Sequence, residues 1–216
     1  MINLHLLDTG KDLRRDQISM IRTSFNKAVK TCEKLISTND VDVIIYHNPA
    51  YVMKETGIGG RTLTTHVIEI PVDAKCKLDP ETLYFTICHE MHHAVRQRKF
   101  GFPSTLLDAV ISEGLADQFE VEINSKRQPI TFRKDINTKA LLNGLSNLKK
   151  GINKKDYDYS GWFFGSSTYP KWLGYTLGNL IVERYVKDSN TKPSGLVGKN
   201  TNIFLKSMES VIATLS

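Results

Sequence analysis

Apolar side chains recur every three or four positions over residues 12–37, a spacing that predicts an amphipathic helix. Residues 41–46 and 62–70 are instead short runs rich in β-branched side chains, which predicts two strands. Residues 51–60 hold three glycines between these runs and are expected to form a turn or loop. The second strand is expected to stop at Pro71.

The helix signals are strongest near the middle of the chain. Asp79 and Pro80 supply a capping acceptor and a proline for the first helical position, so a helix is predicted over residues 79–99. A glycine and a proline then interrupt the pattern, and Ser104 is expected to cap a second helix over residues 104–124.

The remainder of the chain is predicted to be mostly helical. Further helices are expected over residues 170–187 and 203–215, and a loop rich in glycine, serine and aromatic residues over 151–169. Early strands followed by helices predict an α+β fold. We expect an N-terminal lobe (1–124) and a helical C-terminal lobe (125–216), packed as one compact unit with a cleft.

Length and composition are those of a soluble globular protein. The chain has 216 residues, of which 40% are hydrophobic and 24% charged, enough for one sizeable core or two small lobes. Aspartates interrupt the first 17 residues, so no signal peptide is predicted, and no apolar run approaches the roughly 20 residues of a membrane helix. A cytoplasmic location without membrane association is therefore predicted.

Cysteine spacing and charge exclude other classes of protein. The three cysteines, Cys32, Cys76 and Cys88, are odd in number and far apart, which argues against a disulfide framework or a cysteine-rich zinc knuckle. The formal net charge is +6, but the basic residues are scattered rather than clustered in a stripe. We therefore expect a solvated surface and no nucleic-acid partner.

The chemistry of the chain is concentrated in residues 89–93, which form an HExxH motif inside a predicted helix. Residues four apart lie one turn apart on the same helix face, so the imidazoles of His89 and His93 can converge on one zinc ion. Glu90 lies beside them and can take a proton from a water on that ion. This pattern favours metal-assisted hydrolysis.

Glu113, 20 residues after His93, is the candidate third ligand. The glycine and histidine of a metzincin motif are absent after His93, because Arg96 and Lys99 stand in their places. Glu113 faces the same way as an apolar stripe of its helix, and a metal ion removes the cost of burying a carboxylate there. Asp117 follows one turn later and is expected to orient a ligand histidine through a hydrogen bond.

Three other residues are candidate ligands by residue type. Asp108 is an alternative third ligand on the helix of Glu113, although its separation from His93 is shorter. His92 points about 100° away from His93 around the helix, which favours a supporting or surface position. Cys88 precedes His89 directly, and neighbouring side chains on a helix diverge, so it is expected in the core.

These motifs resemble the gluzincin branch of zinc metallopeptidases, in which HExxH is followed by a Glu-x-x-x-Asp on a second helix. The sequence is also similar to a bacterial family described as predicted zinc-dependent proteases. The resemblance covers the four segments GIGGRT (57–62), CHEMHHAVR (88–96), LLDAVISEGLADQFE (106–120) and PKWLGYTLG (170–178). It implies a zincin-like fold with residues 62–70 bordering the cleft, where an extended peptide can pair by strand addition.

A zinc peptidase also needs a donor for the developing oxyanion, and Tyr175 is the first choice. Tyr169 and His66 are weaker alternatives, and Tyr175 can equally be a core or interface residue. The aromatic segment 157–169 is either a substrate-facing lid or a hydrophobic plug, and the sequence does not decide between them.

The sequence thus predicts an enzyme that binds one Zn²⁺ and hydrolyses a peptide or protein substrate, with Glu90 as general base. One alternative is a zinc hydrolase of a non-peptide amide. A second is a non-enzymatic regulatory or interaction protein that keeps zinc for folding, although a structural site usually has four protein ligands. A third is an anion or nucleic-acid binder that uses the surplus of basic residues.

Overall fold

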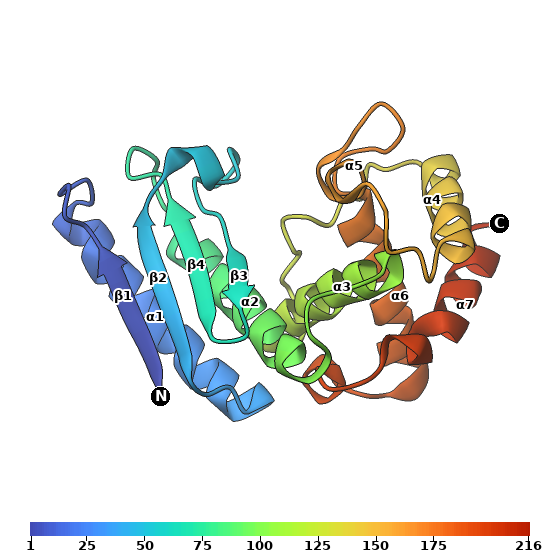
Figure 1. Ribbon diagram of the computed structural model, residues 1–216, viewed down its shortest axis with the longest axis horizontal. Helices are drawn as coiled ribbons and strands as arrows, with labels where there is room; N and C mark the ends of the chain where they lie inside the picture. The colour runs from blue at the N-terminus through green and yellow to red at the C-terminus, as the bar shows by residue number, and fades with distance from the viewer. The chain divides into compact units, whose positions relative to one another are not determined.

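Strands occur only in the first part of the chain, and helices make up most of the rest (Figure 1). The computed structural model describes all 216 residues. The strands are β1 (Ile2–Leu7), β2 (Val41–His47), β3 (Arg61–Thr64) and β4 (Val67–Val72). The α-helices are α1 (Arg15–Ile36), α2 (Pro80–Phe100), α3 (Leu106–Ile123), α4 (Thr138–Lys150), α5 (Tyr159–Phe164), α6 (Leu173–Ser189) and α7 (Leu205–Leu215). The 3₁₀ helices are η1 (Pro49–Tyr51), η2 (Pro193–Leu196) and η3 (Thr201–Phe204).

These elements confirm the predicted α+β fold, with a small sheet followed by helices. By their internal contacts, residues divide into two compact units, Met1–Lys99 and Phe100–Ser216. Helix α3, which the sequence assigned to the first lobe, groups with the helices that follow it. The predicted division of the chain into lobes 1–124 and 125–216 stays a prediction.

The first unit is a four-stranded sheet in the order β1-β2-β4-β3. β1, β2 and β4 are parallel, whereas β3 runs antiparallel to β4 and forms an edge of the sheet. Burial alternates along β2, where Val41, Val43 and Ile45 are buried and the residues between them are half-buried. Helices α1 and α2 cover the buried face (Figure 1).

The edge strand β1 was not predicted. Ile2, Leu4 and Leu6 are half-buried and alternate with exposed residues, which is the period of a strand. The signal is short and lies at the start of the chain. Its pairing partner β2 is reached only after the whole of α1, so local sequence alone gives little sign of the pairing.

The prediction of one strand over residues 62–70 is wrong, because this segment is a hairpin of β3 and β4. Residues 65 and 66 form the turn, and the Nδ1 atom of His66 lies 2.8 Å from the carbonyl oxygen of Asp40. β4 also continues through Pro71, which was expected to end it. The carbonyl of Pro71 accepts a hydrogen bond from the N–H of Gly59 (2.9 Å), which lies before the start of β3. Pro71 therefore faces a position outside β3, and its lack of an N–H removes no hydrogen bond between β4 and β3.

Helix α2 begins where the sequence predicted. The Oδ2 atom of Asp79 accepts a hydrogen bond from the backbone N–H of Thr82 at 2.7 Å, as a capping residue does. Leu83, Ile87 and Met91 are then fully buried along the helix. This packing sets the rotation of α2 and therefore the direction of the HExxH side chains.

Helix α3 is the central element of the second unit. Thr105, rather than the predicted Ser104, caps it by accepting a bond from the N–H of Asp108 at 3.1 Å. α3 crosses α6 where Gly114 meets Gly178, and a Cβ atom on Gly114 would lie 2.2 Å from the carbonyl oxygen of Gly178. The helix backbones are therefore in contact beside Glu113, and only glycine fits at the crossing.

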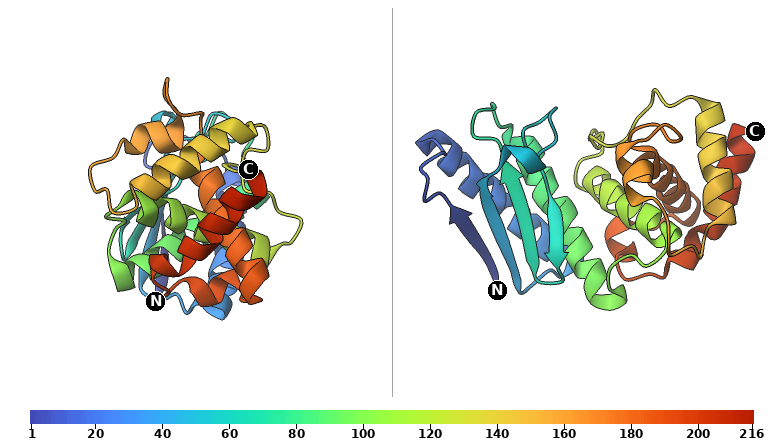
Figure 2. Two further views of the ribbon diagram at one scale, coloured as in Figure 1. Left: turned by 90° about the vertical axis from the view of Figure 1, so that its right-hand side faces the viewer. Right: turned by 45° about the horizontal axis from the view of Figure 1, so that its top comes forward.

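Around α3 and α6, the remaining helices enclose an apolar core that includes Leu145, Phe163, Leu177 and Phe204. α4 and α7 lie side by side on this core (Figure 2). The predicted loop over 151–169 contains the short helix α5, and α6 begins three positions later than the predicted start at Pro170. A left-handed residue, Trp172 (φ 65°), precedes α6 and separates it from Pro170.

Gly114→Ala is expected to lower the free energy of unfolding by about 2 kcal/mol or more, because the added methyl group forces α3 and α6 apart. Urea unfolding of the metal-free protein measures the effect. Gly195→Ala is the matched control, since its Cβ would meet no atom closer than 3.9 Å. Equal stability of the two variants would contradict the close crossing of α3 and α6.

Candidate metal centre

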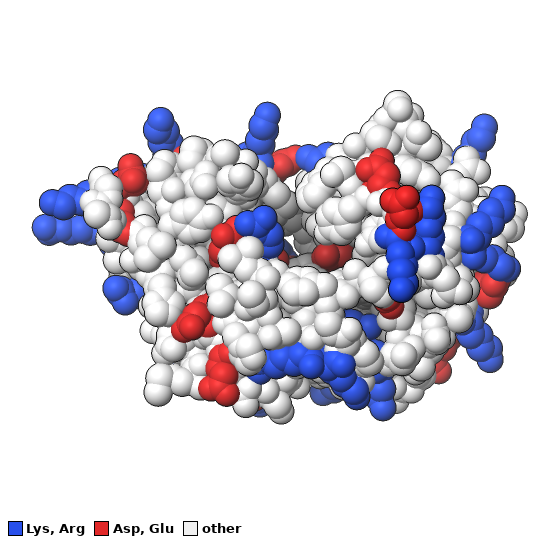
Figure 3. Space-filling view, in the orientation of Figure 1, with Lys and Arg blue, Asp and Glu red and all other residues white.

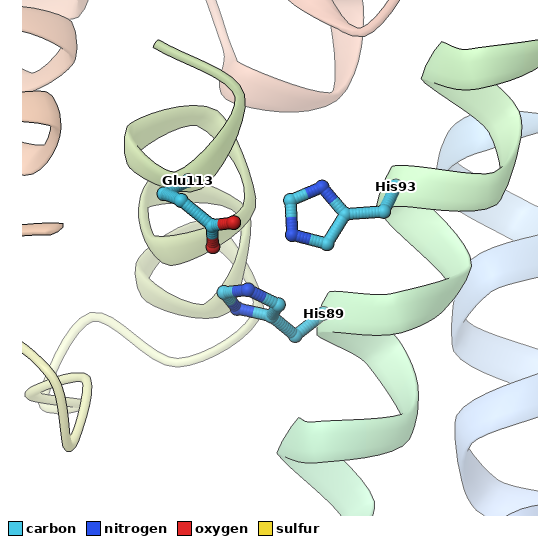
Figure 4. A group of neighbouring side chains, drawn as sticks. All are labelled: His89, His93 and Glu113. Carbon is cyan, nitrogen blue, oxygen red and sulfur yellow. The ribbon is translucent and has the colours of Figure 1, made fainter. Parts of the chain in front are cut away.

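His89 and His93 lie on successive turns of α2, with ring centroids 4.8 Å apart and ring planes inclined by 75°. His93 is buried and His89 is half-buried. Figure 4 shows both imidazoles projecting from the same side of the helix. The helical spacing of the motif is therefore realised, and two nitrogen ligands face one region of space.

Glu113 completes a group with these histidines. One potential ligand atom from each of His89, His93 and Glu113 lies within 4.8 Å of the others (Figure 4). Ligands about 2.1 Å from a tetrahedral zinc ion lie about 3.4 Å apart, a separation that falls within this 4.8 Å limit. Two imidazoles and a carboxylate are also a donor set that suits zinc. The residues present fit the ion.

A second group with the same spacing consists of His89, Asp117 and Glu120. Glu120 is already engaged, because its Oε2 atom accepts a hydrogen bond from Nε of Arg127 at 2.9 Å in a largely buried ion pair. A metal ion bound by Glu120 would share this carboxylate with the buried ion pair. The group that contains Glu113 is the one that the sequence motif predicted.

Asp117 is fully buried and is held by neighbours on two other segments. Its carboxylate accepts hydrogen bonds from Asn179 on α6 and from Thr131, both at 3.4 Å. Asn179 in turn accepts a bond from Gln118 at 3.0 Å. These donors compensate the burial of the charge and fix its direction. The predicted bond from a ligand histidine to Asp117 stays a prediction.

Glu90 is buried. It follows His89 directly in the sequence and precedes His93 by three positions. Its Oε2 atom accepts a hydrogen bond from the Thr62 hydroxyl at 2.8 Å. The sequence identified Glu90 from the motif alone. It gave no sign of Thr62, because the partner comes from a strand 28 positions away.

The alternative ligands lie outside both groups. Asp108 accepts hydrogen bonds from Thr201 at 2.8 Å and from Ser104 at 3.3 Å, which fixes it at the start of α3. Cys88 is fully buried, as predicted for a core residue. His92 is also fully buried, with its ring centroid 6.4 Å from that of His93.

Tyr175, the predicted oxyanion donor, is half-buried on α6 and packs edge-on against Phe163 with ring centroids 5.1 Å apart. The aromatic segment 157–169 holds both buried and exposed rings, and its role as a substrate-facing lid stays a prediction. Trp162 and Phe163 are buried in the core, whereas Tyr159 and Phe164 are 42% and 58% exposed. The segment is thus anchored by buried rings and presents other rings to solvent.

Tyr157 is a neighbour of Glu113 that the sequence did not single out. Burial raises the pKa of Tyr157, and the nearby carboxylates of Asp108 and Glu113 raise it further. The phenol therefore stays protonated and lies within the electrostatic field of Glu113. The segment 151–157 is joined to the start of α3 by the bond from Leu106 N–H to the Lys154 carbonyl (3.0 Å), and Tyr157 packs against the apolar core.

The distribution of charged side chains and the character of the helices relate to the predictions about nucleic acid and membranes. On the face shown in Figure 3, lysine and arginine side chains stand at many separate places, and acidic side chains lie among them. Among the ion pairs elsewhere in the chain is that of Lys149 with Glu209, at 2.7 Å. None of the helices combines the length and the apolar character needed to cross a bilayer. The cytoplasmic location and the lack of a nucleic-acid partner stay predictions.

Replacing Asn179 by alanine is expected to destabilise the metal-free protein by about 2 kcal/mol, because the buried Asp117 carboxylate loses a donor. Urea unfolding provides the measurement. Asn147→Ala, at an exposed position of α4, is the control and is expected to change stability by less than about 0.5 kcal/mol. Similar small changes in both variants would show that the Asn179 amide does not support Asp117.

Comparison with known proteins supports the motif analysis. A family model described as predicted Zn-dependent protease (DUF2268) matches residues 21–206. No curated protein matches the chain. The matched region contains α2, α3 and α6, which carry the residues described above. The finer assignment to the gluzincin branch stays a prediction. Because the match covers most of its length, the chain belongs to the predicted Zn-dependent protease family.

Proposed function

We propose that the protein is a zinc metallopeptidase in which His89, His93 and Glu113 hold one Zn²⁺ and Glu90 is the general base. The observation that carries this proposal is the gathering of the three ligand atoms within 4.8 Å of one another. Membership of a family described as predicted Zn-dependent protease is consistent with it.

Three protein ligands leave a coordination position for water, which distinguishes a catalytic from a structural zinc site. When bound, zinc supplies Lewis-acid chemistry by polarising a carbonyl group and by making a water more acidic. Glu90 lies next to His89 on α2, and its second carboxylate oxygen, Oε1, is left to receive the proton of that water. It then passes the proton to the leaving amine.

A peptide substrate is favoured over a small amide by the position of β3. This strand is an edge of the sheet, and its Thr62 side chain touches Glu90. An extended peptide can add to a sheet edge through backbone hydrogen bonds, which a small amide cannot do over several residues. Pairing with β3 would align a peptide along α2.

The assignment of ligands and base is tested by metal analysis of purified variants. Glu113→Ala is expected to lose its zinc, whereas Glu90→Gln is expected to retain one zinc per chain and to lose peptidase activity by roughly a thousandfold. Activity is measured with labelled casein and a quenched fluorescent peptide library. Small amides tested in parallel separate peptide from non-peptide hydrolysis.

Two further variants serve as controls for the rival ligands. Asp108→Asn and Glu120→Gln are expected to keep the zinc, because their carboxylates are engaged by Thr201 and Arg127, respectively. If Glu120→Gln loses its zinc and Glu113→Ala retains it, the metal is bound by the second group, which contains His89, Asp117 and Glu120. A Glu90→Gln protein as active as the wild type would remove the proposed general base.

The oxyanion donor is proposed to be Tyr175, with Tyr157 as the comparison residue. Tyr175→Phe is expected to lower kcat about a hundredfold with zinc retained, because one hydrogen bond to the transition state is lost. Tyr157→Phe is expected to change kcat only a fewfold. If the two effects are reversed, the donor is Tyr157, whose hydroxyl lies in the field of Glu113.

A further inference from the structure

A buried side-chain contact between the sheet and the HExxH helix joins β3 to Glu90. The Thr62 Oγ1 atom lies 2.8 Å from Oε2 of Glu90 and 3.0 Å from its backbone carbonyl oxygen. Both residues are buried, each with 7% of its surface exposed. A buried hydrogen bond to a carboxylate is stronger than one between neutral groups, so this contact fixes the direction of the Glu90 side chain.

The opposite side of the same carboxylate faces Gly60. A Cβ atom on Gly60 would lie 2.7 Å from Oε1 of Glu90 and 2.8 Å from Cγ2 of Thr86. Any side chain at residue 60 would therefore displace the carboxylate. The φ angle of Gly60 is not in the left-handed region, so the constraint is space and not backbone conformation.

Orientation matters here because a free glutamate side chain samples many rotamers. Restricting it costs up to about 2 kcal/mol of conformational entropy, and a base that is already aligned avoids that cost during the reaction. Thr62 engages Oε2 and leaves Oε1, over Gly60, as the oxygen that can approach a water.

We propose that Gly60 and Thr62 are positioning residues for the general base, Glu90, and this inference rests on the proposed function. β3 is four residues long and is an edge of the sheet, so the strand that orients Glu90 also offers its backbone to an extended peptide. Seating of the substrate and alignment of the base are thereby linked through the segment from Gly60 to Thr62.

The test compares Thr62→Val, which removes the hydroxyl and keeps the shape, with Thr62→Ser, which keeps the hydroxyl. In zinc-loaded protein, Thr62→Val is expected to lower kcat about tenfold on a quenched fluorescent peptide, with KM within about twofold and zinc content unchanged. Thr62→Ser restores most of kcat. Gly60→Ala lowers kcat in the same way.

Thr86→Val is the matched control, because its hydroxyl, one turn before Glu90, bonds only the carbonyl of Thr82 (2.9 Å). It is expected to retain wild-type kcat. Wild-type kcat in Thr62→Val, or an equal loss in Thr62→Val and Thr62→Ser, would overturn the inference. Neither result touches the proposed function, provided that Glu90→Gln remains inactive.

A second measurement needs no activity. The crystal structure of metal-free Thr62→Val is expected to show the Glu90 carboxylate rotated away from β3, with α2 and the histidines unchanged. A carboxylate that keeps its wild-type position without the hydroxyl would overturn the positioning role, whatever the substrate of the enzyme.

Discussion

A carboxylate removed from water is stable only when a cation or hydrogen-bond donors face it, and this constraint organises the chemistry of the protein. Each buried acid of α2 and α3 has such a compensation: Thr62 for Glu90, Asn179 and Thr131 for Asp117, and Arg127 for Glu120. Glu113 lies instead with the imidazoles of His89 and His93. The donors to Glu90, Asp117 and Glu120 thus stabilise buried charges around the group that could hold a metal.

The local part of the site could be predicted from sequence because it depends on a single helix. Asp79 and Pro80 start α2, its apolar residues fix its rotation, and the four-residue spacing then places His89 above His93. For Glu113 the expected apolar stripe is not a distinct face, because α3 is buried on nearly every side, and the role of Glu113 as a ligand stays a prediction. The α+β class followed from the order of strands and helices along the chain.

What the sequence did not predict depends on contacts between distant segments. β1 forms only by pairing with β2 beyond α1, and residues 62–70 fold as a hairpin because β4 also pairs with β2. Thr62 and Tyr157 are ordinary residues in sequence, and they matter only because a strand and a loop bring them to Glu90 and to Glu113. Gly60 and Gly114 similarly mark close approaches that no turn signal distinguishes.

The central claim is that one zinc ion is held by two imidazoles of α2 and one carboxylate of α3. A crystal structure of the zinc-loaded protein, with anomalous scattering recorded on both sides of the zinc absorption edge, tests it most directly. The account predicts a single peak bonded to His89, His93 and Glu113, with a water in the remaining position. A peak bonded to Asp117 and Glu120, or a fourth protein ligand in place of water, would contradict it.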